Sequence, residues 1–176
     1  PTLGFFSPRL GEGVVWRNVN ATAMRSTLLH EASHFLMARG GAWGAPRWLN
    51  EGLAQCFEHS SMSGNLLTVR PPPHYVEYLK VTGAPSVEGI ITNRSSWNDL
   101  PADKVGPLYI QGWALSAMLM SSENGQQTLA AVVRAFKVEG SRESGLTAIE
   151  ETYRGGLSGL QRDLDRLVSR GTASPG

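Results

Sequence analysis

The residues best suited to chemistry are His30, Glu31 and His34, which form the pentapeptide His-Glu-Ala-Ser-His. The surrounding run from Ser26 to Met37 is helix-like, and side chains four positions apart lie on one face of a helix, one turn from each other. Two imidazoles placed in this way can both reach one Zn²⁺ ion at about 2.0–2.1 Å. Glu31 lies beside them and can serve a metal-activated water without being a ligand. The alternative is a helix with two solvated or core histidines and a surface glutamate.

A second helix is expected to supply a third ligand. Gly40 and Gly41 suit the end of the first helix, and Pro46 suits the first turn of another, which runs on through Trp-Leu-Asn-Glu-Gly-Leu-Ala. A catalytic zinc site commonly has three protein ligands and an open position for water. Glu51 is the candidate, because sixteen residues separate it from His34, enough for a turn and a helix packed back on the first. The alternative is that Glu51 is a solvated helix residue.

These motifs resemble those of the gluzincin metallopeptidases. The segment Pro46–Ala54 is similar to the corresponding stretch of the aminopeptidase-N family. Taken with Gly4–Arg9 and Tyr109–Leu115, it looks more like the peptidase-MA-like domains, and the resemblance covers residues 4–120. It implies an α+β, mostly helical, zincin-like fold with a small N-terminal β-sheet and a helical C-terminal part.

The resemblance also implies a role for each site residue. His30, His34 and Glu51 would bind one zinc ion, which lowers the pKa of its bound water to about 7 and polarises the scissile carbonyl. Glu31 would be the general base that takes a proton from this water and passes it to the leaving amine. Tyr109, near the start of a predicted helix, is the candidate donor to the oxyanion of the tetrahedral intermediate. The alternative for Tyr109 is a tyrosine at the edge of the core.

The chain departs from the aminopeptidase-N pattern upstream of the metal motif. That family carries a Gly-x-Met-Glu-Asn motif, whose glutamate holds the free amino terminus of the substrate, and no such motif occurs here; Glu12 is the only glutamate before Glu31. We therefore expect an endopeptidase that acts on a peptide or protein substrate. Two alternatives stay open: a catalytically inactive peptidase-like binding domain, which would not need Glu31, and a non-peptidase zinc amidohydrolase.

Other elements follow from local pattern. Gly13–Val19 reads as a strand, and the resemblance implies that it borders the substrate cleft; the alternative is an ordinary strand within the fold. Ser60–Asn65 reads as a mobile loop. Apolar spacing predicts five further helices: His74–Val81, Pro107–Met120, Gln126–Val138, Ser144–Tyr153 and Leu157–Val168.

Residues on the second helix are candidates to orient the metal ligands. A metal-bound histidine usually donates its other N–H to a carboxylate or a carbonyl. Gln55 and Glu58 share the helical face of Glu51, and Asn50 could contact the backbone of the first helix. The remaining histidines lack ligand spacing and are expected at the surface: His59 and His74.

Composition limits the other functions. The 176 residues carry a net charge of +1 without a Lys/Arg-rich run, which argues against a nucleic-acid partner. No apolar stretch reaches the length of a membrane span. Cys56 is the single cysteine, so an intrachain disulfide is excluded, and it is expected in the core.

We expect one domain over residues 1–176, with a disordered polar tail at Thr172–Gly176. Because the sequence begins with Pro1 instead of methionine, we expect a processed protein or an excised domain, and a secreted or periplasmic location is slightly favoured. Another domain of a longer chain could complete the cleft.

Overall fold

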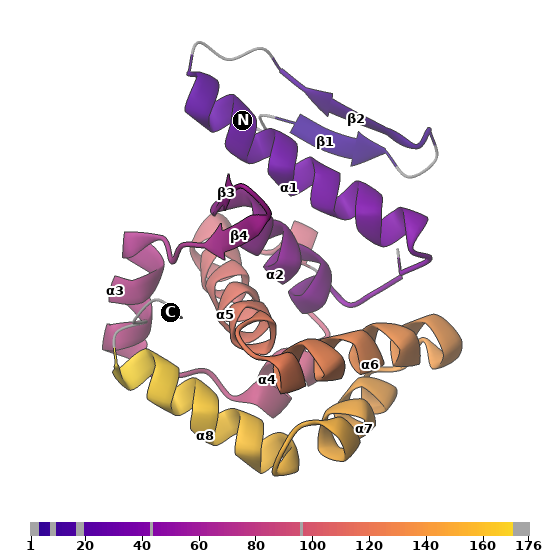
Figure 1. Ribbon diagram of the computed structural model, residues 1–176, viewed down its shortest axis with the longest axis vertical. Coiled ribbons are helices and arrows are strands. Elements are labelled where there is room, and N and C mark those ends of the chain that lie inside the picture. Colours follow the sequence, from indigo (N-terminus) through magenta and orange to yellow (C-terminus); the bar gives the residue numbers. More distant parts are fainter. Residues whose placement is uncertain (1–3, 8–9, 17–19, 43, 96, 171–176) are drawn as a thin grey trace.

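Helices dominate the fold, and two short antiparallel hairpins interrupt them (Figure 1). The structure is a computed structural model, and it describes residues 4–7, 10–16, 20–42, 44–95 and 97–170. Its elements follow one another in this order: β1 (Gly4–Ser7), β2 (Glu12–Val15), α1 (Ala21–Arg39), α2 (Arg47–Glu58), β3 (Ser60–Ser63), β4 (Leu66–Val69), α3 (Pro73–Thr82), α4 (Val87–Thr92), the 3₁₀ turn η1 (Trp97–Asp99), α5 (Ala102–Met120), α6 (Glu123–Glu139), α7 (Arg142–Thr152) and α8 (Gly156–Ser169).

The predicted first helix is confirmed as α1, and it is longer than expected at its start. Asn20 caps it, because its side-chain oxygen accepts hydrogen bonds from the backbone N–H groups of Thr22 and Ala23 at 2.9 and 3.2 Å. At the other end, Gly41 adopts a positive φ of 74°, which glycine accepts without strain. The predicted Gly-Gly stop is therefore correct.

α1 carries little apolar surface into the core. Its buried residues are Glu31 and Ser33, whereas the side chains of Leu28 and Leu36 are 57% and 60% exposed. The β1–β2 hairpin packs on this helix, with Phe6 against the ring of Phe35 (Figure 1). The attachment of α1 to the rest of the molecule therefore depends strongly on its polar contacts with α2.

The apolar core lies in the body formed by α2 to α8. α2 lies between α1 and α5, so it joins the N-terminal helix to this body (Figure 1). The predicted apolar stripe of the last helix is confirmed, since Leu160, Leu164 and Val168 are buried and the other two leucines pack against the core. Cys56 is also buried there, as expected.

Two glycines let α2 and α5 approach closely. A Cβ built at Gly52 would overlap the backbone carbonyl of Gly112 and lie 2.5 Å from the hydroxyl of Ser116. A Cβ at Gly112 would lie 2.8 Å from the carbonyl oxygen of Trp48. Because the closest atoms are helical backbone, movement of the Ser116 side chain alone could not make room for a methyl group at Gly52.

We expect Gly52→Ala to lower the free energy of unfolding by about 3 kcal/mol, because the two helices must separate to admit a methyl group. Urea unfolding followed by circular dichroism measures this change. Gly106→Ala is the matched control on α5, since a Cβ there meets nothing within 4 Å. Equal stability of the Gly52 variant and this control would contradict the close approach.

Two expectations about elements are wrong. The helix expected from Pro107 begins at Ala102, and Pro107 lies inside it; a proline there removes one backbone hydrogen bond, but the surrounding residues continue the helix. Ser60–Asn65 is not an open loop, because Ser60–Ser63 pairs with Leu66–Val69 as a hairpin. The serine-rich composition of β3 hides its strand character in the sequence.

The remaining predicted helices are confirmed within a few residues at their ends, and α4 was not predicted. The predicted strand Gly13–Val19 is found as Glu12–Val15, while its last three residues lie outside the described part of the chain. The expected tail, Thr172–Gly176, also lies outside it. Among the described residues, no helix is both long and apolar enough to cross a membrane.

Candidate metal centre

A cleft of about 540 Å³ lies where β1, α1, α5 and the start of α2 meet. It contains all five site residues expected from the sequence: His30, Glu31, His34, Glu51 and Tyr109. The other lining residues come from β1 and from the start of α2 and the loop before it: Gly4, Phe5, Phe6, Ala45, Arg47 and Asn50. Segments far apart in the sequence thus contribute titratable side chains to one cleft.

The three expected ligands converge on one point. The Oε2 atom of Glu51 lies 3.6 Å from Nε2 of His30 and 3.7 Å from Nε2 of His34. One ligand atom from each of these three residues lies within 4.8 Å of the others. The two imidazole rings are 4.9 Å apart and inclined at 79°, and each presents its Nε2 atom to Glu51.

In its residue types, and in the separation of Glu51 from each histidine, this donor set suits a tetrahedrally coordinated metal ion; the ligand atoms, which lie within 4.8 Å of one another, would draw closer around it. Ligand atoms that sit about 2.1 Å from one ion at angles of 110–120° lie about 3.4–3.6 Å from each other. The two measured nitrogen–oxygen distances are close to that value. Two imidazole nitrogens and one carboxylate oxygen also leave a fourth position for water, as catalytic zinc sites do. His30, His34 and Glu51 can therefore hold a metal ion.

The other nitrogen of each histidine is already engaged. His30 Nδ1–H donates to Oε2 of Glu58 at 2.9 Å, and His34 Nδ1–H donates to Oδ1 of Asn50 at 2.9 Å. Because an ionised carboxylate only accepts, this bond keeps a proton on Nδ1 of His30, so Nε2 is the nitrogen that can bind a metal once its own proton is released. Glu58 therefore holds the ring of His30, the contact that an orienting residue would make. Asn50 contacts the ring of His34, and not the helix backbone that was expected.

Gln55 supports the site indirectly. Its Nε2 donates to Oε2 of Glu58 at 3.0 Å, and its Oε1 accepts from the hydroxyl of Tyr75 at 2.7 Å. The buried Tyr75 on α3 therefore steadies the carboxylate that orients His30. Sequence reasoning missed Tyr75, because nothing in its local pattern shows that α3 packs against α2.

His30 and Glu51 shift each other's pKa values. Burial alone would lower the pKa of His30, but its contacts with Glu51 and Glu58 outweigh that effect and raise the pKa to about 9. Burial would raise the pKa of Glu51, but its interaction with His30 and the charges of His34 and Arg47 lower it. Without metal, the ionised carboxylate of Glu51 therefore faces the protonated, positively charged imidazole of His30.

We expect zinc binding at pH 7.5 to release about one proton from His30, because a ligand nitrogen must be neutral and this imidazole is protonated below pH 9. Because zinc competes with this proton for His30, the apparent zinc affinity falls by about tenfold per pH unit as the pH drops below 9. Calorimetric titrations in buffers of different ionisation enthalpy count the protons. A count that is independent of pH between 6 and 10 would contradict the raised pKa.

Glu31 and Tyr109 face the same cleft. Burial raises the pKa of Glu31 above its usual range, although the nearby His30 and His34 counteract this, and its carboxylate accepts a backbone hydrogen bond from Phe6. Burial, and next the charge of Glu51, raises the pKa of Tyr109 to about 12. Its phenol is therefore neutral at ordinary pH and can act as a hydrogen-bond donor.

Two details differ from the sequence-based expectations. The strand that lines the cleft is β1, with Gly4, Phe5 and Phe6, whereas β2 pairs with β1 and contributes none of the described lining residues. His74 is exposed as expected, but His59 is half-buried against the ring of Tyr75. Both differences arise from pairing and packing between elements, which local patterns do not specify.

Arg47 is a cleft residue that sequence reasoning missed. Its Nη1 donates to Oε1 of Glu51 at 3.1 Å. The signal was present, because Arg47 lies four residues before Glu51 in the predicted second helix, and such pairs share a helical face.

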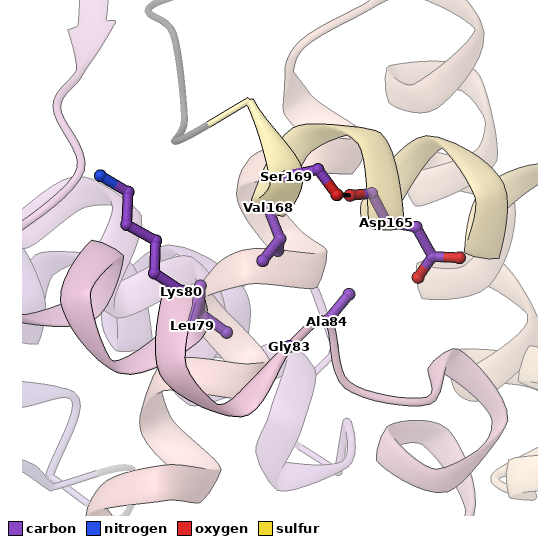
Figure 2. A pocket seen from close by; sticks show the side chains of 7 residues that line it. All are labelled: Leu79, Lys80, Gly83, Ala84, Asp165, Val168 and Ser169. Carbon is purple, nitrogen blue, oxygen red and sulfur yellow. Dashed lines mark hydrogen bonds between the residues drawn. The ribbon is translucent and has the colours of Figure 1, made fainter.

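A second hollow, of about 350 Å³, lies between α3 and α8 (Figure 2). Its charged lining residues are Lys80 and Asp165; the side chain of Lys80 points away, and Asp165 accepts a hydrogen bond from Gln161. The hydroxyl of Ser169 is bonded to the backbone of Asp165. Asp165 and Ser169 are thus engaged in hydrogen bonds, and the described residues of this hollow form no set of metal ligands.

Comparison with known proteins adds no assignment to this geometry. No family model matches the chain, and no curated protein and no solved structure matches it.

Proposed function

We propose that this chain is a zinc-dependent peptidase domain of gluzincin type, with a zincin-like fold and endopeptidase activity. The observation that carries the proposal is the convergence of His30 Nε2, His34 Nε2 and Glu51 Oε2. Glu31 and Tyr109 line the same cleft, and an acid–base group and a neutral donor beside a metal position suit amide hydrolysis. Zinc suits the site because it accepts nitrogen and oxygen ligands in tetrahedral geometry.

The reaction divides among these residues. When bound, zinc would lower the pKa of a water molecule and polarise the scissile carbonyl. Glu31 takes the proton of the attacking water as the new carbon–oxygen bond forms, and it delivers that proton to the leaving nitrogen as the carbon–nitrogen bond breaks. Tyr109 donates a hydrogen bond to the carbonyl oxygen while negative charge grows there.

The cleft favours the interior of a peptide over its amino terminus. Glu31 and Glu51 are the carboxylates among the described lining residues, and both already have roles in the mechanism. No further carboxylate of this described lining could hold a free ammonium group. An extended substrate could instead align along β1, whose main chain borders the cleft, and pair with it as an added strand.

We expect Tyr109→Phe to lower kcat by about 10²-fold with little change in KM, because the lost hydroxyl acts in the transition state. Zinc content should be unchanged, since Tyr109 is not a ligand. Steady-state kinetics beside the control Tyr78→Phe, on α3 and outside the cleft, measures the effect. An unchanged kcat would remove Tyr109 from the mechanism.

The test of the proposed function begins with the metal. Elemental mass spectrometry of purified wild-type protein should find about one zinc ion per chain, and Glu51→Ala should lose it. Glu77→Ala, an exposed carboxylate on α3, is the control that should retain it. Absence of zinc from the wild type, even after zinc is added, would refute the proposal.

A panel of peptides and non-peptide amides completes the test. Cleavage within peptides supports the endopeptidase assignment. Hydrolysis of non-peptide amides alone would identify an amidohydrolase, and a zinc-loaded protein that cleaves nothing in the panel would identify a binding domain.

A further inference from the structure

Arg47 occupies a distinctive place at the metal centre. It is the first residue of α2, one turn before Glu51, and its side chain is 43% exposed whereas that of Glu51 is 9% exposed. Its guanidinium therefore lies at the mouth of the cleft and reaches inward to a nearly buried carboxylate. The pair joins Nη1 of Arg47 to Oε1 of Glu51 at 3.1 Å.

The two oxygens of Glu51 have different partners. Oε2 faces Nε2 of His30 at 3.6 Å and Nε2 of His34 at 3.7 Å, so it is the oxygen directed at the metal position. Oε1 faces Arg47. A carboxylate can bind a metal through one oxygen or through both, and two-oxygen binding would draw Oε1 away from the guanidinium.

We propose that Arg47 is a positioning residue that restricts Glu51 to one-oxygen coordination and thereby keeps a coordination position open for water. This inference rests on the proposed function, because it needs a metal at the three-ligand site. A charge-assisted hydrogen bond has a defined direction, so it holds one carboxylate oxygen where a metal cannot share it. A second ligand oxygen would crowd the position that hydrolysis requires.

Cobalt(II) in place of zinc reports the coordination number, because its visible absorption is strong in four-coordinate sites and weaker when a fifth ligand is added. We expect wild-type protein loaded with Co²⁺ to show the four-coordinate spectrum. Arg47→Met, which keeps an unbranched side-chain stem but removes the charge, should lose visible absorption as Oε1 joins the metal. Arg47→Lys should restore most of it, since an ammonium group can still engage Oε1.

Arg94→Met is the matched control, because Arg94 also pairs with a glutamate but lies outside the cleft. It should leave the cobalt spectrum unchanged. Zinc X-ray absorption, which counts first-shell oxygen and nitrogen atoms, provides a second readout on the same variants. Circular dichroism verifies that each variant is folded before its spectrum is compared.

Identical cobalt spectra and zinc coordination numbers in wild type and Arg47→Met would overturn the inference while leaving the metal site intact. The same spectra with a raised KM for acidic peptides alone would also overturn it, and would make Arg47 a substrate contact. Failure of wild-type protein to take up Co²⁺ or Zn²⁺ at all is a different result, which refutes the proposed function itself.

Discussion

Glu31→Gln is expected to retain a full equivalent of zinc and to lose peptide hydrolysis by about 10²–10⁴-fold. The amide keeps the size of the side chain but cannot take a proton from the attacking water. Glu31 is buried in the cleft, and burial raises its pKa, so the native carboxyl is suited both to accept a proton and to give it up. Turnover and elemental analysis on the same sample separate the two properties.

Glu77→Gln is the control for this substitution, because Glu77 is exposed on α3 and lies outside the cleft. It should hydrolyse peptides as the wild type does. Wild-type turnover by the Glu31 variant would show that another group is the base. Loss of zinc from that variant would instead show that Glu31 contributes to metal binding.

Zinc is expected to raise the free energy of unfolding by about 4 kcal/mol when free zinc is a thousandfold above its Kd, because only the folded chain assembles the three ligands. The effect should be largest at α1, whose buried residues are the polar Glu31 and Ser33. His30 and His34 on α1 meet Glu51, Glu58 and Asn50 on α2, so a bound ion would tie the two helices together.

Urea unfolding with zinc and with a chelator measures the gain, and hydrogen exchange locates it. Backbone amides of α1 should exchange more slowly with zinc bound. Glu51→Ala should show no gain, while Glu77→Ala should show the full gain. Equal unfolding curves with zinc and with chelator in the wild type would mean that no metal joins α1 to α2.

The sequence predicted those features that a single element defines. His30 and His34 share a face because helical geometry alone places residues four apart together. The C-terminal end of α1 and the buried stripe of α8 were predictable for the same reason, since a glycine stop and apolar spacing act within a few residues. Glu51 was predictable as a candidate ligand near the two histidines because its residue type suits zinc and its helix could fold back on the first.

Relations between elements could be decided only by tertiary structure. The candidates Gln55 and Glu58 share one helical face, and the packing of α2 against α1 brings Glu58 to 2.9 Å from Nδ1 of His30, while Gln55 lies 3.5 Å from that atom and bridges Glu58 and Tyr75. Likewise, strand pairing places β1 at the cleft, although β2 is the strand nearer to α1 in sequence.

The sequence by itself thus determined the residue types of the candidate metal site and the spacing of its histidines along α1, because backbone hydrogen bonding fixes the position of every residue on one helix. Tertiary structure decided which groups surround them. The contact at Gly52 sets how α2 packs on α5, and that packing carries Glu51 and Arg47 to the histidines. These residues come together because segments distant in the sequence pack against one another, and no short stretch of sequence shows that packing.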